Sequence, residues 1–179
     1  MTDKIYLVGF MASGKTTLAK ALAERLGWRW EDIDDLIEAR ERLTVADIFA
    51  RHGEAYFRAK ERELLGVLQP MRHVVVATGG GTFADVENRQ RINLDGTSIW
   101  LDVPLPDLIP RIPLDGRRPL AANRQQLERL YATRLEAYRL AHVHLAVPAR
   151  APVAAVLEQA LEALRASPGI VGVVSRPGV

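Results

Sequence analysis

Apolar positions along the chain follow two spacings, one typical of buried strands and one typical of helices. A short unbroken apolar run, as in Val74–Ala77, is typical of a strand that is buried on both faces of a parallel sheet. Apolar residues three and four positions apart, as between Lys15 and Leu26, predict a helix with one buried face. Strands are predicted over residues 5–8, 28–30, 73–77, 98–101 and 143–147, where residues 28–30 are assigned from their apolar–polar alternation.

Capping residues and glycines place the boundaries of the helices. Thr44 and Asp47 have the spacing of a capping box and open a helix, which the pair His52-Gly53 stops. Gly27 closes the first helix in the same way. The predicted helices cover residues 15–26, the stretch from the acidic cluster to about 42, then 44–52, 55–68, 86–94, 104–111, 125–141 and 153–165.

Strands that alternate with helices predict an α/β fold with parallel strands and right-handed crossovers. At 179 residues the chain is close to the ~150 residues of one domain, and no repeat or linker divides it. We therefore expect one domain over residues 1–166. Residues 112–123 have no periodicity and are rich in proline, glycine and arginine, which predicts a lid. Residues 167–179 are expected to form a disordered tail.

Composition and charge exclude several classes of protein. The chain has no cysteine, which excludes a disulfide framework, a thiolate zinc site and a thiol nucleophile. Its 24 basic and 22 acidic residues leave a net charge of +2, so no overall field attracts nucleic acid or a membrane. No apolar run approaches the ~20 residues of a membrane span, and no signal sequence precedes the first strand. We therefore expect a cytoplasmic protein whose partners include neither nucleic acid nor a membrane.

The sequence GFMASGKT at residues 9–16 matches the phosphate-loop pattern G-x-x-x-x-G-K-[ST], and it lies between a predicted strand and a predicted helix. The two glycines allow a tight turn in which backbone N–H groups surround phosphate oxygens. Lys15 would neutralise charge on the β- and γ-phosphates, and the Thr16 hydroxyl would ligate Mg²⁺. The motif predicts nucleotide binding, and the residues expected to contact the nucleotide are Ala12, Ser13, Gly14, Lys15, Thr16 and Thr17.

Acidic residues follow the second predicted strand. Because open α/β sheets bind ligands at the carboxyl ends of their strands, Asp32 and Asp34 are expected near the phosphate loop. Alternation along an extended segment would place both side chains on the same side. One could then hold Mg²⁺ through water while the other accepts a hydroxyl's hydrogen bond or its proton. This segment supports equally well a helix start stabilised by Asp32, Asp34 and Asp35.

Two further motifs suggest a second binding site. Three consecutive glycines, Gly79, Gly80 and Gly81, follow a predicted strand and imply that another group approaches the backbone closely; the alternative is a flexible loop. Arg58 and Glu61 share a helix face, where Glu61 could fix the guanidinium for bidentate capture of a carboxylate. The spacing alone favours the alternative, an exposed ion pair.

Arginines and histidines in the second half of the chain suggest different roles. Arg117 and Arg118 lie in the segment without periodicity and suit a lid that closes a cation onto the transferred phosphoryl group. The alternative is a solvated basic loop. His142 and His144 share one face of a predicted strand, but no third ligand lies nearby in the sequence, so a structural role is favoured over a metal site.

These motifs, in this order, resemble the shikimate kinase family of small phosphate-loop kinases, from residue 5 to about residue 164. The resemblance is carried by the phosphate loop, Asp32-Ile33-Asp34, Phe57-Arg58 with Glu61, the glycine triplet, Arg118-Pro119-Leu120, and Arg134 with Tyr138. It implies a three-layer α/β/α fold with a five-stranded parallel sheet and a lid, akin to nucleoside monophosphate kinases. It also implies ATP-dependent phosphorylation of the 3-hydroxyl of shikimate, with Mg²⁺ as cofactor, by a monomeric enzyme of aromatic amino-acid biosynthesis.

The resemblance further implies a role for each matching residue. Asp34 matches the candidate base, which hydrogen-bonds the substrate hydroxyls, and Asp32 matches the acid that binds Mg²⁺ through water. Gly80 matches the position in the glycine triplet that donates a backbone N–H to the substrate. The remaining matches are arginines: Arg58 and Arg134 clamp the shikimate carboxylate, Arg118 reaches the phosphates, and Arg150 lies beside the adenine.

Two alternative functions fit parts of the sequence. One is a kinase for another small polyol acid such as gluconate, and the presence of both clamp arginines with Asp34 favours shikimate over it. The other is a catalytically silent nucleotide-binding homologue, which the retention of Lys15 and Asp34 disfavours. Ala12 stands where the family often has glycine, a mild change that removes no charged group.

Overall fold

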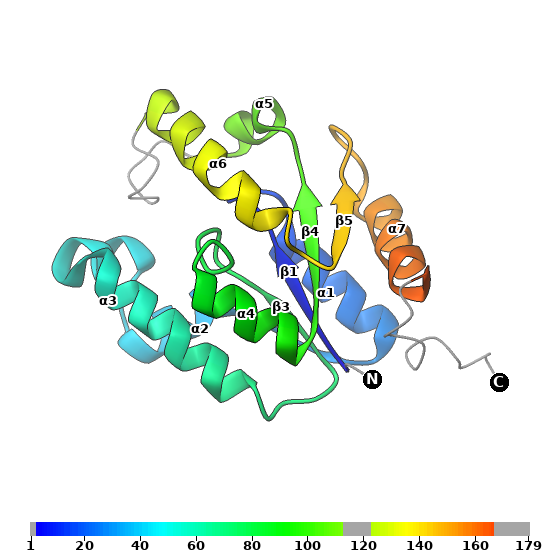
Figure 1. Cartoon of the computed structure of the whole chain (residues 1–179), viewed down its shortest axis with the longest axis horizontal. Coiled ribbons are helices and arrows are strands. Elements are labelled where there is room, and N and C mark those ends of the chain that lie inside the picture. The colour runs from blue at the N-terminus through cyan, green and yellow to red at the C-terminus, as the bar shows by residue number, and fades with distance from the viewer. Residues whose placement is uncertain (1–2, 113–122, 167–179) are drawn as a thin grey trace.

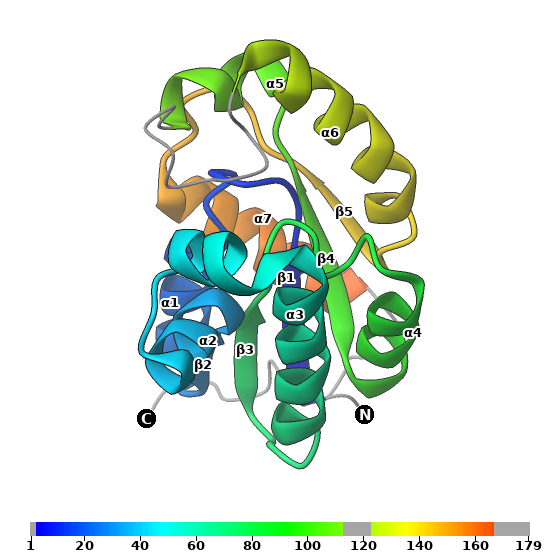
Figure 2. The ribbon, with the colours of Figure 1, turned by 90° about the vertical axis from the view of Figure 1, so that its left-hand side faces the viewer.

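A computed structural model describes residues 3–112 and 123–166, and it contains one sheet of five parallel strands with helices on both faces. The strand order is β2-β3-β1-β4-β5. Figure 2 shows α1 and α7 on one face of the sheet and α4 and α6 on the other, while α2 packs against α3 on the side nearest the viewer. The strands are β1 (Lys4–Val8), β2 (Arg29–Asp32), β3 (Val74–Ala77), β4 (Thr97–Asp102) and β5 (Val143–Ala146).

The helices connect successive strands, as the alternating pattern predicts (Figure 1). The predicted three-layer α/β/α architecture is confirmed. None of the helices in the described ranges is long and apolar enough to span a membrane. The helices are α1 (Lys15–Leu26), α2 (Ile33–Glu41), α3 (Val45–Leu68), α4 (Val86–Asp95), α5 (Leu105–Leu108) with the 3₁₀ turn η1 (Ile109–Arg111), α6 (Arg124–Tyr138) and α7 (Val153–Ala166).

The core lies around the central strand β1, all of whose residues are buried. β1 pairs with β3 and β4, and Ile5 lies opposite Val75 on one side and Thr97 on the other. Unbroken apolar runs suit these central strands because helices cover both of their faces. The edge strand β5 instead alternates, with Val143 and Leu145 buried and His144 and Ala146 exposed.

The structure refines two details of the predicted elements. The two helices predicted on either side of Gly53 lie in one element, α3, and the predicted break is a kink at Gly53, whose φ of 80° and ψ of 173° are not helical. The extended segment ends at Asp32, and Asp34 already lies in α2, so strand alternation does not relate the two carboxylates. Both carboxylates nevertheless line the same pocket, as expected, because α2 begins at the edge of the sheet.

The carboxyl ends of all five strands meet at one edge of the sheet, since the strands are parallel. The phosphate loop follows β1, Asp32 ends β2, and the glycine triplet follows β3 after Thr78. The candidate site therefore lies at this edge, where open α/β sheets bind ligands. The expected lid falls mainly on residues 113–122 and the expected tail on residues 167–179, which lie outside the described part of the chain.

Candidate active site

The phosphate loop turns tightly between β1 and α1. Gly9 and Gly14 have φ values of 140° and 94°, and Ala12 also adopts a left-handed φ of 61°. A Cβ atom at Gly9 would lie 2.9 Å from the carbonyl oxygen of Leu101, so the loop cannot hold a larger residue there. The side chain of Lys15 is buried beneath the loop and its Nζ donates a hydrogen bond to the carbonyl oxygen of Phe10 at 2.7 Å. The loop therefore has its lysine folded inward toward the space that it encloses.

A polar pocket opens over this loop and extends to the end of β2. Among the residues that line it are Ala12, Gly14, Lys15, Thr16, Thr17 and Asp32. Asp32 caps the N-terminus of α2, because its Oδ1 accepts from the backbone N–H groups of Asp34 and Asp35. Its other oxygen, Oδ2, accepts a hydrogen bond from the Thr16 hydroxyl at 2.6 Å. Asp32 therefore caps α2, as one of the two sequence-based interpretations predicts, and its other oxygen lies at the phosphate loop, where a role in magnesium binding stays a prediction.

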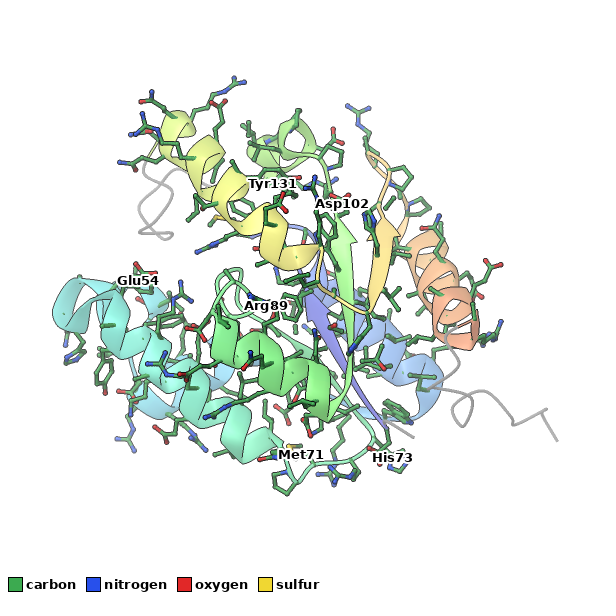
Figure 3. All side chains as sticks on the ribbon, in the orientation of Figure 1. Glu54, Met71, His73, Arg89, Asp102 and Tyr131 are labelled. Atoms are coloured by element: carbon green, nitrogen blue, oxygen red, sulfur yellow. The ribbon has the colours of Figure 1, made fainter. Side chains whose placement is uncertain are left out.

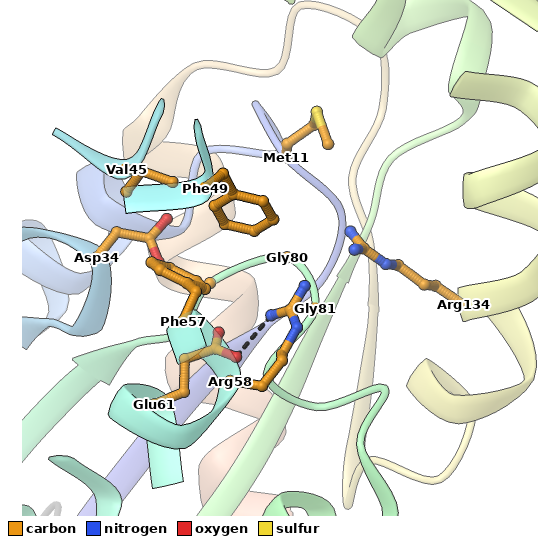
Figure 4. Close-up of a pocket in the computed structure, with 11 residues that line it drawn as sticks. Met11, Asp34, Val45, Phe49, Phe57, Arg58, Glu61, Gly80, Gly81 and Arg134 are labelled. Carbon is orange, nitrogen blue, oxygen red and sulfur yellow. Dashed lines mark hydrogen bonds and ion pairs between the residues drawn. The ribbon is translucent and has the colours of Figure 1, made fainter. Parts of the chain in front are cut away.

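A second pocket, open to solvent, lies beside the first. Figure 4 shows that Arg58 from α3 and Arg134 from α6 extend their guanidinium groups toward each other across it. Apolar side chains from α3 form the opposite wall, and the glycine triplet forms the floor. Two cations facing one cavity, with an apolar wall, fit an organic acid with a carboxylate at one end.

Arg58 is held in place by two carboxylates. Its Nη1 lies 2.6 Å from Glu61 Oε2, and its Nη2 lies 3.1 Å from Glu54 Oε1. Glu61 is fully buried and Arg58 is only 15% exposed, so the alternative of an exposed ion pair is wrong. Burial opposes the charged guanidinium most strongly, but Glu61 and Glu54 together outweigh it and raise the pKa of Arg58 above its usual value.

Arg134 is buried without an ionic partner among the described residues. Its side chain is 6% exposed, and no carboxylate in residues 3–112 and 123–166 lies within ion-pair distance of it. Burial lowers the pKa of its guanidinium. The guanidinium lies over the ring of Phe10, 5.8 Å from its centre, at the mouth of the second pocket. A buried cation in this position is suited to bind an anionic group of a ligand.

The glycine triplet is explained by close approach of side chains, as the sequence predicts. A Cβ atom at Gly79 would lie 2.6 Å from Asp34 Oδ1, and one at Gly81 would lie 2.3 Å from the Arg58 guanidinium. A Cβ at Gly80 would lie 3.2 Å from Arg134 Nη1. None of the three has a positive φ, so the loop needs glycine for space rather than for backbone conformation.

The two pockets meet at a short common boundary. Met11, Asp34 and Gly80 line both of them. Tyr138, on the same face of α6 as Arg134, donates a hydrogen bond to the carbonyl oxygen of Gly80 and so ties α6 to this boundary. Burial raises the pKa of Tyr138 to about 12, so the phenol is the donor at neutral pH. Asp34 is therefore the carboxylate that lines both described pockets.

Some expected residues do not line the two pockets, and several residues that do, Arg111 among them, were not predicted. Arg118, with its neighbour Arg117, lies outside the described residues. Arg150 is exposed in the loop after β5, at the same edge of the sheet, but it lines neither pocket. Arg111, at the end of η1, lines the phosphate pocket, and the sequence signals it only by its place at the start of an arginine-rich stretch.

The side chains around this edge do not form a metal site of histidines. His142 Nδ1 accepts from the backbone N–H of Ser98, and His144 pairs with Asp102 and stacks on Trp100. No group of three histidine or acidic side chains that could hold a metal occurs in the described ranges. Figure 3 shows Asp102 at the end of β4, Tyr131 on α6 and Glu54 on α3.

The fold and the two adjoining pockets define a phosphate-loop kinase, akin to nucleoside monophosphate kinases, with an acceptor site for a small acid. Residues 11–165 match the family model described as shikimate kinase. The chain is 42% identical to a shikimate kinase of Persephonella marina over 155 residues, which cover 86% of this chain and 94% of that one. This chain belongs to the shikimate kinase family.

Solved structures agree with this assignment. Shikimate kinase from Acinetobacter baumannii, whose structure is a complex with shikimate, has a TM-score of 0.82 and 32% identity, covering 92% of each chain. A gluconokinase from Sinorhizobium meliloti has a TM-score of 0.55 and 17% identity over 94% of this chain and 95% of that one, a likeness that shows the fold alone. The comparisons therefore lend no support to gluconate as the acceptor.

Proposed function

We propose that this enzyme transfers the γ-phosphoryl group of ATP to the 3-hydroxyl of shikimate at the boundary that its two pockets share. As a member of its family, the chain catalyses ATP-dependent phosphorylation of shikimate in the shikimate pathway. The observation that carries the proposed site is the pair of guanidinium groups that converge on a pocket adjoining the phosphate loop. Phosphoryl transfer needs such positioning more than it needs covalent chemistry.

The acceptor binds through its carboxylate. Arg134 supplies a buried cation that no described carboxylate neutralises, and Arg58 supplies a second one whose orientation Glu61 fixes. Charge-assisted hydrogen bonds from two guanidinium groups orient a planar carboxylate as well as bind it. Gly80 donates its backbone N–H to the acceptor between Gly79 and Gly81, where the absence of side chains lets the substrate approach.

The transferred phosphoryl group moves from the cationic groups that hold ATP toward the acceptor hydroxyl that Asp34 orients. Backbone N–H groups of residues 12–17 and Lys15 hold the phosphates, and Arg118 closes on them from the lid. Asp34 orients the shikimate hydroxyl and accepts its proton while the new oxygen–phosphorus bond forms and the bond to the ADP oxygen breaks. ADP leaves with the bridging oxygen. Exclusion of water by the lid favours the acceptor over hydrolysis.

The residues at the phosphate loop fit a magnesium ion. Thr16 and Asp32 present a hydroxyl and a carboxylate oxygen that already lie 2.6 Å apart, and both line the phosphate pocket. Mg²⁺ prefers such hard oxygen donors and binds through few protein ligands together with water and phosphates. Thr16 would hold the ion directly and Asp32 through water, and the bound ion would neutralise phosphate charge.

The remaining contacts complete the nucleotide site. Arg150 lies beside the adenine, and Arg111 adds a cation to the phosphate pocket that it lines. ATP and shikimate are the ligands, and neither nucleic acid nor a membrane takes part. We also propose a cytoplasmic location and a monomeric enzyme, and the monomer is supported by two pockets that residues of a single chain line.

ADP release tests the proposal directly. With Mg-ATP, we expect strong stimulation by shikimate and none by gluconate or by a control without acceptor. Lys15→Ala removes the cation at the β- and γ-phosphates and is expected to lower turnover by at least about 100-fold. Equal stimulation by gluconate would contradict the acceptor assignment, and undiminished turnover in the lysine variant would contradict the ATP site.

A further inference from the structure

Thr82 directly follows the glycine triplet and is fully buried. Its hydroxyl donates a hydrogen bond to Glu61 Oε1 at 2.6 Å. Its backbone N–H donates to the carbonyl oxygen of Gly79 at 3.1 Å, which closes a tight turn. Because threonine is β-branched and therefore restricted at χ1, this turn also restricts where the hydroxyl points.

The two oxygens of Glu61 are divided between two donors. Oε2 accepts from Arg58 Nη1, and Oε1 accepts from Thr82. A fully buried carboxylate keeps its charge only where hydrogen bonds and an opposite charge satisfy it. The threonine hydroxyl supplies a charge-assisted bond to the oxygen that the arginine leaves unused. The Thr82 hydroxyl thereby fixes the plane of the Glu61 carboxylate, which in turn accepts the hydrogen bond from the Arg58 guanidinium.

Glu54, the second ion-pair partner of Arg58, constrains the guanidinium less than Glu61 does. Glu54 accepts from Arg58 Nε and Nη2 at 3.3 and 3.1 Å, but its own side chain is half exposed. Solvent screens such a pair, and its net contribution is small. The orientation of the guanidinium therefore depends mainly on the buried side, where Glu61 and Thr82 lie.

We propose that Thr82 is a positioning residue for the acceptor, which acts through Glu61 to hold Arg58 in the orientation that captures the substrate carboxylate. Thr82 itself lines neither pocket, so it acts without touching substrate. The inference rests on the proposed role of Arg58 in carboxylate binding. It predicts an effect on shikimate binding that is separable from nucleotide binding and from folding.

Two substitutions at this position test the inference. Thr82→Val keeps the volume and the branching but removes the hydroxyl, and it is expected to raise the KM for shikimate about tenfold. The KM for ATP is expected to stay within about twofold and kcat within about threefold, since the phosphate loop is untouched. Thr82→Ser restores the hydroxyl and is expected to return the KM for shikimate to within about threefold of the parent.

A matched control separates positioning from a general loss of stability. Ser98 carries another fully buried hydroxyl, which bonds to Asn93 and the backbone N–H of His142 and lies on neither pocket. Ser98→Ala should lower the unfolding midpoint while leaving the KM for shikimate unchanged. If Thr82→Val instead changes all kinetic constants together in proportion to lost stability, Thr82 is only structural and the inference is overturned.

Arg58→Ala, measured in parallel, shows whether the proposed carboxylate site or only the positioning role of Thr82 is wrong. If it leaves the KM for shikimate unchanged, the proposed carboxylate site is wrong. If it raises this KM but Thr82→Val does not, only the positioning role is wrong. When Thr82 acts through Arg58, the double variant should bind shikimate no more weakly than Arg58→Ala alone. Additive effects in this cycle would overturn the inference as well.

Discussion

Arg58 and Arg134 carry the same group into one pocket, but their surroundings prepare them differently. Arg58 is neutralised by Glu61 before any ligand arrives, and this pairing raises its pKa. Arg134 is buried without a described carboxylate beside it, and burial lowers its pKa. On the proposed function, a bound carboxylate would supply the negative charge that no described carboxylate provides to Arg134. Arg58, already fixed by Glu61, would mainly orient the same carboxylate.

Gly81→Ala tests how closely Arg58 is fitted to its surroundings. The added Cβ would lie 2.3 Å from the guanidinium, so the arginine must move away from the acceptor. We expect the KM for shikimate to rise at least about tenfold, from loss of a charge-assisted contact, and the KM for ATP to change little. Steady-state kinetics with each substrate varied in turn measures both values.

Gly66 provides the matched control for this substitution. It lies inside α3, a Cβ there would meet nothing within 4 Å, and its φ is not positive. Gly66→Ala should leave both KM values unchanged and stabilise the helix by up to about 1 kcal/mol. A parental KM for shikimate in Gly81→Ala would show that Arg58 does not need its present position.

The positions of individual site residues are predictable from sequence where a motif fixes them. They are not predictable where the burial of a side chain determines its role. The phosphate loop assigns Lys15 by spacing alone, and the glycine triplet signals close approach without saying by what. The i,i+3 spacing of Arg58 and Glu61 is the same for a surface pair and for a buried one. Only packing of α3 against the triplet distinguishes the two, and no local pattern contains that information.

The C-terminus of α3 depends on a buried lysine from another element. Lys4, at the start of β1, donates from Nζ to the carbonyl oxygens of Leu68 and Gln69 and to Asp95 Oδ2 at 2.6 Å. Its side chain is completely buried, and Asp95 also accepts from the Tyr6 hydroxyl. One cation thus ties the last turn of α3, the end of α4 and the central strand together.

Lys4→Met is expected to destabilise the protein by about 3–5 kcal/mol, because it leaves a largely buried carboxylate without its cation. Chemical denaturation monitored by circular dichroism measures this loss. The double variant with Asp95→Asn should recover part of it, since no buried charge then remains. A single variant that unfolds at the parental denaturant concentration would refute the structural role of the pair.

Element boundaries follow from sequence wherever glycine or a capping residue ends a periodic stretch. α1 is predicted to the residue, because Gly14 and Gly27 both take left-handed conformations at its ends. The break predicted at Gly53 is present as a kink within α3, because the φ and ψ angles of this glycine are not helical. The β2 strand extends to Asp32 because it pairs with β3, a partner that its own sequence does not reveal.

The candidate active site combines the loops at the carboxyl edge of the sheet with side chains from α3 and α6. Apolar residues in strands and helices form one core that ends with Leu164 on α7. Every pocket residue named in the described chain lies before the end of α6. On these grounds we propose residues 1–166 as the kinase domain.

Removal of residues 167–179 tests this boundary. The truncated chain is expected to keep the parental kcat, both KM values and the parental unfolding midpoint within experimental error. Thermal unfolding and the coupled ADP assay measure these quantities on the same preparation. A clear loss of stability, or a change in either KM, would extend the functional domain beyond Ala166.

The strand order has a consequence for the chain as it is synthesised. β1 is the first strand of this sheet to leave the ribosome and the centre of the finished sheet, yet its partners begin only at Val74 and Thr97. Both edges of this apolar strand therefore stay unpaired until β3 is translated, and one edge stays unpaired until β4 follows. The segment that carries the phosphate loop is thus the one that a chaperone has most reason to shield during translation.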